Sequence, residues 1–145
     1  MIVIKDLSFA YPRQPLLFQG LNLSLGEGHI YGLLGKNGAG KSTLLKNMVG
    51  LAYPRQGSCL INGVNVSGRP VSVLEDVYFL AEQVFAPSLT PEQFAASTAV
   101  FYPKFSNADF YQCLKVRGLD AAGAMYKQSW GQEKKPIIAF GLPTN

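Results

Sequence analysis

Residues 35 to 43 combine glycines, a lysine and two hydroxyls at a spacing that suits phosphate binding. The segment reads Gly-Lys-Asn-Gly-Ala-Gly-Lys-Ser-Thr and fits the pattern G-x-x-x-x-G-K-[ST] at every defined position. Glycines let successive backbone N–H groups approach an anion closely, and the lysine brings positive charge to the same place. The pattern therefore predicts a nucleotide phosphate loop.

The loop residues have separate predicted roles. Lys41 can reach the β- and γ-phosphates, Ser42 offers its hydroxyl to Mg²⁺, and Thr43 lies one step further, where it would touch the α-phosphate. Backbone amides from Asn37 to Thr43 would surround the β-phosphate. The predicted nucleotide-binding residues of this segment are Gly35, Asn37, Gly38, Ala39, Gly40, Lys41, Ser42 and Thr43.

Such a loop works only between a strand and a helix, and the flanking residues predict both. The apolar run 30–34 precedes the loop and reads as a strand. After it, Leu44, Leu45, Met48 and Val49 follow helical spacing, and Gly50 stands where a left-handed stop is expected. The motif is therefore predicted at a strand-to-helix turn.

Further strands are predicted around this turn. Alternating residues in 2–10 and 21–25 predict two antiparallel strands, and 58–61 predicts another, followed by an Asn62-Gly63 hairpin and residues 64–66. The short apolar run 77–80 reads as a buried strand.

From residue 88 the pattern becomes helical. Thr90 with Pro91 and Gln93 predicts a capped helix start, as does Ser106, whose helix would end at Gly118. Ser129 with Gln132 predicts a third start.

Composition limits the possible partners. The net charge of +4 comes from scattered Lys and Arg residues, so no nucleic-acid partner is expected. We expect no signal peptide and no membrane span in these 145 residues. Cys59 and Cys113 lack paired spacing and are expected to be reduced, buried small side chains.

Taken together, these motifs resemble the ATP-binding subunit of an ABC transporter over essentially all 145 residues. The resemblance implies an α/β fold: a P-loop NTPase core with an antiparallel β-subdomain and a small helical insert, incomplete at the C-terminus. It assigns residues 1–87 to the β-rich and P-loop core, 88–128 to the helical subdomain and 129–145 to the signature helix.

Tyr11 matches the aromatic residue that stacks on adenine in this family. A ring stacked on a base contributes about 1 to 3 kcal/mol, which is enough to anchor ATP without hydrogen bonds to the edges of the adenine. The alternative is a core tyrosine at a strand end.

The segment 79–83 is similar to the family's Q-loop, whose glutamine contacts Mg²⁺ and the attacking water. Residue identity favours Gln83 for this catalytic and metal-binding role, whereas the apolar pattern favours Glu82. Either side chain carries the oxygen that Mg²⁺ accepts. The alternative is a solvated polar pair after a strand.

Residues 128–132 resemble the LSGGQ signature, although Gln128 replaces its leucine and Trp130 a glycine. In the family this motif closes over the γ-phosphate of a second ATP-binding subunit in a head-to-tail dimer. The resemblance assigns ATP contacts to Ser129, Gly131 and Gln132. A simple capped helix start is the alternative.

The resemblance implies ATP and Mg²⁺ as cofactors, a transmembrane permease subunit as partner, and a cytoplasmic location at the inner face of the membrane. The family's acidic Walker B strand and switch histidine follow the signature helix, and residues 133–145 contain neither. Two hypotheses stay open: an ATPase subunit that drives transport, and a truncated nucleotide-binding fragment without turnover.

Overall fold

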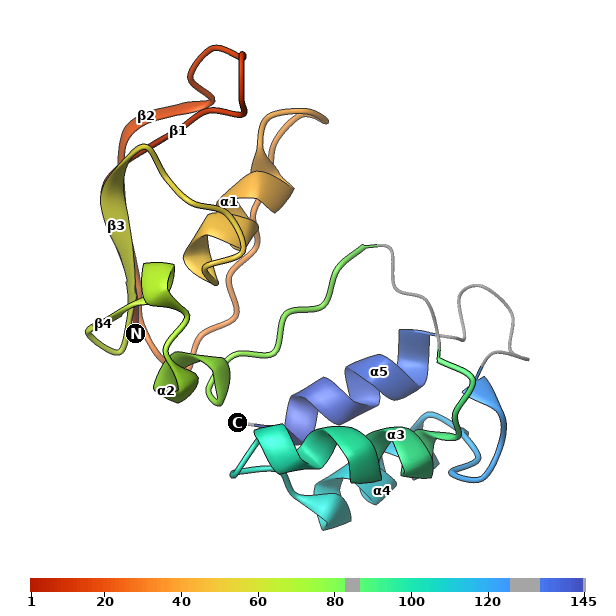
Figure 1. Ribbon diagram of the computed structural model, residues 1–145. Coiled ribbons are helices and arrows are strands. Elements are labelled where there is room, and N and C mark those ends of the chain that lie inside the picture. Colours follow the sequence, from red (N-terminus) through yellow and green to blue (C-terminus); the bar gives the residue numbers. More distant parts are fainter. Residues whose placement is uncertain (83–86, 126–133, 145) are drawn as a thin grey trace. The chain divides into compact units, whose positions relative to one another are not determined.

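The computed structural model describes residues 1–82, 87–125 and 134–144 of the chain (Figure 1). The chain divides into two compact units, Met1–Leu74 and Glu75–Asn145. The first holds the sheet and the predicted phosphate loop, and the second is helical. The predicted assignment of 1–87, 88–128 and 129–145 to three functional segments stays a prediction.

The first unit is built on a four-stranded antiparallel sheet with the order β2-β1-β3-β4 (Figure 1). Its strands are β1 (Ile2–Phe9), β2 (Phe18–Leu25), β3 (Gln56–Ile61) and β4 (Val64–Asn65). The predicted hairpin is confirmed, because Asn62 and Gly63 take φ values of 49° and 81° between β3 and β4. The antiparallel subdomain expected from the alternating residues is therefore present.

The pairing of β1 with β3 is irregular at one point. The register shifts between Lys5 and Ser8, where Asp6 takes a φ of 48°. Gly57 lies opposite with a φ of 81°, and a Cβ there would collide with the carbonyl oxygens of Lys5 and Asp6. Only glycine fits this close approach of two strands.

Helix α1 (Lys41–Met48) lies against the sheet (Figure 1) and completes the core of the first unit. The predicted helix and its stop are confirmed: Val49 is the C-cap and Gly50 has a φ of 69°. After β4 come the short helices η1 (Val66–Gly68) and α2 (Val71–Leu74). The buried apolar side chains of this unit include Ile4, Leu7, Phe9, Leu44, Met48, Cys59, Ile61, Val66 and Val73.

The predicted strand at 30–34 is wrong for this structure. Residues 30–36 have no helix or strand assignment, and Ile30 and Leu34 are 104% and 92% exposed. A strand needs a neighbour to satisfy its backbone groups, and each strand among the described residues pairs only within β1 to β4. The apolar run therefore precedes the loop without the backbone hydrogen bonds that pair one strand with another.

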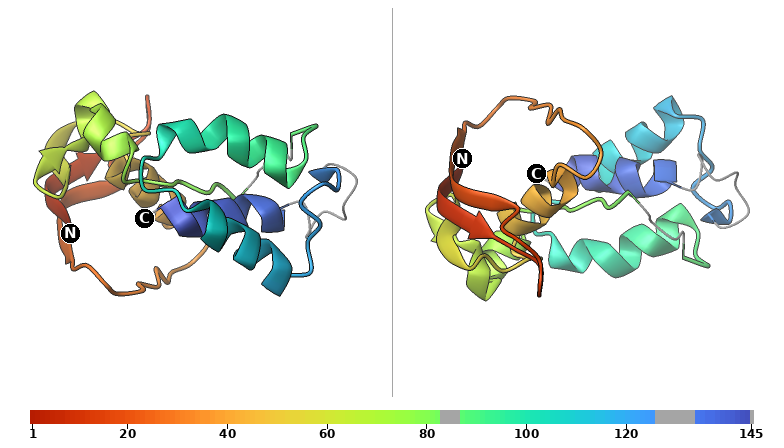
Figure 2. Two further views of the ribbon diagram at one scale, coloured as in Figure 1. Left: turned by 90° about the horizontal axis from the view of Figure 1, so that it is seen from below. Right: turned by 90° about the horizontal axis from the view of Figure 1, so that it is seen from above.

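The second unit packs three helices side by side (Figures 1 and 2): α3 (Pro91–Thr98), α4 (Asn107–Val116) and α5 (Lys134–Gly141). The capping box predicted at Thr90 is confirmed, with Gln93 N–H donating to Thr90 Oγ1 at 3.2 Å and Thr90 N–H to Gln93 Oε1 at 3.0 Å. Ser106 also caps as predicted, accepting from Asp109 N–H at 3.2 Å. The 3₁₀ turns η2 (Ala99–Phe101) and η4 (Leu142–Thr144) follow α3 and α5.

Aromatic rings form the core of this helical unit. Phe140 of α5 is fully buried and lies within 4.6 to 6.2 Å, centroid to centroid, of five other rings. These rings belong to Tyr78, Phe94, Tyr102, Phe105 and Phe110. The core therefore depends on one central side chain.

The buried strand predicted at 77–80 is also wrong. These residues have no strand assignment, Tyr78 is only partly buried and Leu80 is 37% exposed. Instead, the Tyr78 hydroxyl donates to the Ile137 carbonyl at 3.1 Å, and burial, with a smaller effect of Tyr102, raises the pKa of Tyr78 to about 12. The segment packs on helices through its side chains, because the described residues offer it no strand to pair with.

Candidate nucleotide-binding site

The predicted phosphate loop ends at an uncapped helix terminus. Gly40 is the N-cap of α1, with φ 90° and ψ 12°, and makes no side-chain capping bond. No acidic residue lies in the first turn of α1. The first N–H groups of the helix and its positive dipole end are therefore free of any capping side chain, as an anion site requires.

The loop is closed by its own lysine. Lys41 Nζ donates to the carbonyl oxygens of Gly35 and Lys36, at 2.7 and 2.8 Å. The Ala39 N–H donates to the Lys36 carbonyl at 3.2 Å and tightens the turn. The ammonium thus lies across the start of the loop, with a third N–H left for a further acceptor.

Gly40 is also packed from outside the loop. A Cβ at Gly40 would lie 2.9 Å from Leu17 Cδ2 and 2.9 Å from Phe18 Cζ. Leu17 and Phe18, at the start of β2, therefore pack against the loop where it enters α1. No local sequence signal points to this contact, since the residues are more than twenty positions apart.

Two of the predicted site residues, Tyr11 and Thr43, lie in contact. The Tyr11 hydroxyl and Thr43 Oγ1 are 2.8 Å apart, and the Tyr11 ring meets Phe9 edge to face at a centroid distance of 5.0 Å. Tyr11 is 40% exposed, whereas Thr43 is 7% exposed. The core tyrosine considered as the alternative does not describe this half-exposed ring beside the loop.

Asn47 lies one turn below Thr43 and is fully buried. Its Nδ2 donates to the Thr43 carbonyl at 2.8 Å, whereas its Oδ1 has no hydrogen-bond partner among the described residues. A buried acceptor without a donor costs roughly 1 to 3 kcal/mol. This side chain fixes the first turn of α1 at a cost in stability.

We predict that Asn47→Leu raises the free energy of unfolding by about 1 kcal/mol, because it removes the unpartnered oxygen and keeps the branching of the side chain. Asn47→Asp is the opposing variant and should destabilise, since it buries a charge. Urea unfolding followed by circular dichroism measures both. A loss of stability in Asn47→Leu would contradict this prediction and would mean that the lost Nδ2 bond to Thr43 outweighs the removal of the unpartnered oxygen.

The remaining predicted residues belong to the second unit or lie outside the described residues. Glu82 is exposed, and its backbone carbonyl accepts a hydrogen bond from Lys134 Nζ. Gln83, Ser129, Gly131 and Gln132 fall in 83–86 and 126–133, outside the described residues. Their roles stay predictions.

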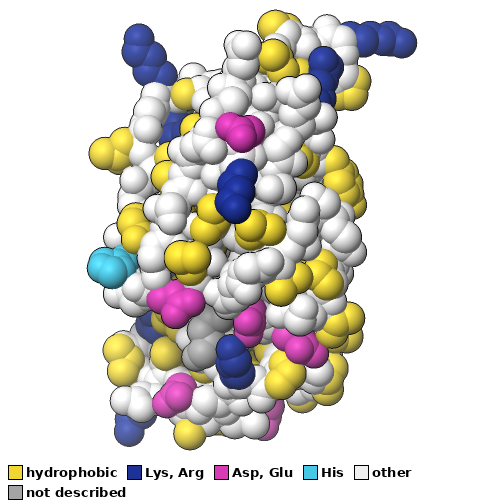
Figure 3. All heavy atoms as spheres, turned by 90° about the vertical axis from the view of Figure 1, so that its left-hand side faces the viewer, with side chains coloured by type: hydrophobic (Ala, Val, Ile, Leu, Met, Phe, Trp, Pro, Cys, Tyr) yellow, Lys and Arg dark blue, Asp and Glu magenta, His cyan; other side chains and the backbone are white. Residues whose placement is uncertain are grey.

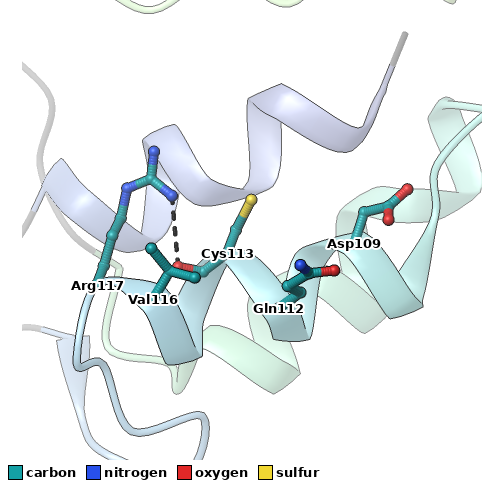
Figure 4. Close-up of a pocket in the computed structure, with 5 residues that line it drawn as sticks. All are labelled: Asp109, Gln112, Cys113, Val116 and Arg117. Atoms are coloured by element: carbon teal, nitrogen blue, oxygen red, sulfur yellow. Dashed lines mark hydrogen bonds between the residues drawn. The ribbon is translucent and has the colours of Figure 1, made fainter.

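A separate pocket in the helical unit is lined by residues of α4 and by Arg117, which follows it (Figure 4). Its volume is about 280 Å³, and its lining side chains are Asp109, Gln112, Cys113, Val116 and Arg117. Arg117 donates to the Cys113 carbonyl at 3.4 Å, so its guanidinium is folded back along the helix (Figure 4). None of the predicted site residues that the structure describes lines this pocket.

Charged side chains are dispersed on the surface shown in Figure 3, where Lys and Arg do not form one continuous patch. In the ranges that the structure describes, no helix has both the length and the apolar character needed to cross a bilayer.

Comparisons with known proteins identify a family that this chain resembles. Residues 18–144 match the ABC transporter family. Putative ABC transporter ATP-binding proteins of Bacillus anthracis and Bacillus thuringiensis subsp. konkukian are 42% and 36% identical, each over 100% of this chain and 27% of the relative. A solved putative ABC transporter ATP-binding protein from Pyrococcus furiosus has a TM-score of 0.81 at 26% identity, over 98% of this chain and 70% of that chain.

The chain belongs to the ABC transporter family. The expected fold class is confirmed: an α/β P-loop NTPase core with an antiparallel subdomain and a small helical part. The chain spans about a quarter of the length of the curated relatives named above.

Proposed function

We propose that this chain binds Mg-ATP at the phosphate loop and serves as an ATP-binding part of an ABC transporter. The observation that carries the proposal is the uncapped start of α1 with Lys41 folded across the loop before it. Backbone N–H groups and one ammonium at a helix N-terminus are what a polyphosphate needs.

The proposed roles follow the positions of the side chains. Lys41 contacts the terminal phosphates, the exposed Ser42 hydroxyl contacts Mg²⁺, and Thr43 contacts a phosphate nearer the base. Tyr11 offers its ring to the adenine from beside the loop. Glu82 or Gln83 would orient water or Mg²⁺.

The proposed partners are a transmembrane permease subunit and a second ATP-binding subunit arranged head to tail. In the head-to-tail dimer, the γ-phosphate of the ATP bound to the second subunit would be contacted by Ser129, Gly131 and Gln132. The family membership supports both proposals.

A competition experiment tests the proposed binding. The purified chain is titrated with a fluorescent ATP analogue in Mg²⁺, and unlabelled ATP, ADP, AMP and Mg-tripolyphosphate are then added. We expect ATP and ADP to displace the analogue far better than AMP, because the loop holds the β-phosphate. Equal displacement by AMP, or no binding, would contradict the proposal.

Phosphate release separates the two hypotheses of transport ATPase and non-hydrolysing fragment. After the signature segment, the sequence contains no apolar run followed by Asp-Glu, so we expect the chain alone to release no phosphate above buffer. Phosphate release that disappears in Lys41→Ala would mean that these 145 residues hydrolyse ATP by themselves.

A further inference from the structure

The hydrogen bond between Tyr11 and Thr43 joins the two parts of the proposed ATP site. It runs from Tyr11, two residues beyond the end of β1, to the first turn of α1, spans 32 positions of sequence and is partly buried. Its 2.8 Å length is typical of a well-formed O–H···O bond. The Tyr11 ring is held at its other end by the edge-to-face contact with Phe9.

The chemistry of the two hydroxyls favours one direction for this bond. The distance allows either oxygen to donate, but a phenol is a much stronger acid than an aliphatic alcohol and so is the better donor. With Tyr11 donating, Thr43 Oγ1 accepts and keeps its own hydrogen. No second partner for Thr43 Oγ1 is present in the described part of the chain. That hydrogen is therefore available to a ligand.

A hydroxyl that already accepts one hydrogen bond becomes a stronger donor, since the two bonds polarise each other. Thr43 lies in the first turn of α1, where no side chain caps the backbone amides. The bond from Tyr11 fixes the Thr43 rotamer and the direction of its hydrogen. Both effects favour donation to a phosphate oxygen.

We propose that Tyr11 is a positioning residue for the phosphates, acting through its hydroxyl on Thr43, in addition to the proposed stacking of its ring on adenine. The chain of donors runs from the Tyr11 hydroxyl to Thr43 and from Thr43 to a phosphate oxygen. This inference rests on the proposed function, because it places a phosphate at the start of α1. It makes tyrosine, rather than any aromatic residue, the residue required at position 11.

Two ligands distinguish the contribution of the Tyr11 hydroxyl from that of its ring. Tyr11→Phe keeps the ring and removes only the hydroxyl, so calorimetry with Mg-ATP and with base-free Mg-tripolyphosphate should show the same loss of affinity for both, about three- to tenfold. Tyr11→Ala should weaken Mg-ATP further but match Tyr11→Phe for tripolyphosphate. A loss of affinity that is the same for both ligands must come from contacts with the phosphates, because tripolyphosphate has no base.

Variants of Thr43 test the proposed path. On a Thr43→Val background, Tyr11→Phe should cause no further loss, because the bond is already gone. Thr43→Ser keeps the hydroxyl and should retain the dependence on Tyr11. Tyr31→Phe is the matched control: its hydroxyl accepts from Gly26 N–H at 2.9 Å, away from the loop, and its removal should leave both affinities unchanged.

The outcomes separate this inference from the proposed function. If the wild-type chain binds and Tyr11→Phe leaves the tripolyphosphate affinity unchanged, the hydroxyl has no positioning role and the inference fails alone. A lowered melting temperature with unchanged affinities would likewise overturn it, because the bond would then be purely structural. If the wild-type chain binds neither ligand, the proposed function fails and the inference with it.

Discussion

Replacing Lys41 by alanine should abolish measurable binding of Mg-ATP, with a loss of at least about a hundredfold. The ammonium would make charge-assisted hydrogen bonds to two phosphates, worth about 3 kcal/mol together, which corresponds to that factor. Isothermal titration calorimetry with Mg-ATP measures the loss directly. The melting temperature should change little, because the loop is exposed and its lysine bonds only two loop carbonyls.

Lys46→Ala is the matched control for this variant. Lys46 is exposed in the last turn of the same helix, and its loss changes the net charge equally. Affinity for Mg-ATP should stay within about twofold of wild type, since an exposed charge at that distance is largely screened by salt. Equal losses in the two variants would mean that the effect comes from overall charge and not from the loop.

Replacing Phe140 by alanine should bring the helical unit close to unfolding. Removal of a fully buried phenylalanine costs about 3 to 5 kcal/mol, and ring-to-ring contacts add to this. Small units have only about 5 to 15 kcal/mol of total stability. Thermal and urea unfolding followed by far-ultraviolet circular dichroism measure the change.

Phe101→Ala provides the comparison, because Phe101 is 67% exposed and the substitution removes the same ring from the surface. Its effect on the free energy of unfolding should stay within about 0.5 kcal/mol. A Phe140→Ala protein as stable as Phe101→Ala would show that the aromatic cluster is not the core of this unit.

Local signals predicted local structure well. The capping residues Thr90 and Ser106 fix helix starts through bonds three residues away, and Asn62-Gly63 fixes a hairpin through its own φ values. Each signal lies within the few residues that it organises. The same is true of the phosphate loop, whose glycines, lysine and following helix are contiguous.

Structure that depends on distant partners was not predictable in the same way. The apolar runs 30–34 and 77–80 look like strands, but a strand exists only when another strand pairs with it. The contacts of Gly40 with Phe18, and the bond of Tyr11 to Thr43, likewise join residues far apart in sequence. Composition and spacing along the sequence do not show which distant residues will contact each other.

The proposed ATP site depends on main-chain amides from Asn37 to Thr43 that, together with Lys41, hold a polyphosphate. An NMR titration of the ¹⁵N-labelled chain observes these amides themselves, with Mg-ATP and then Mg-tripolyphosphate added in steps. We predict that the largest saturable amide shifts fall on residues 37–43 with both ligands and disappear in Lys41→Ala. Binding of Mg-ATP that leaves these amides unchanged would mean that the polyphosphate lies elsewhere.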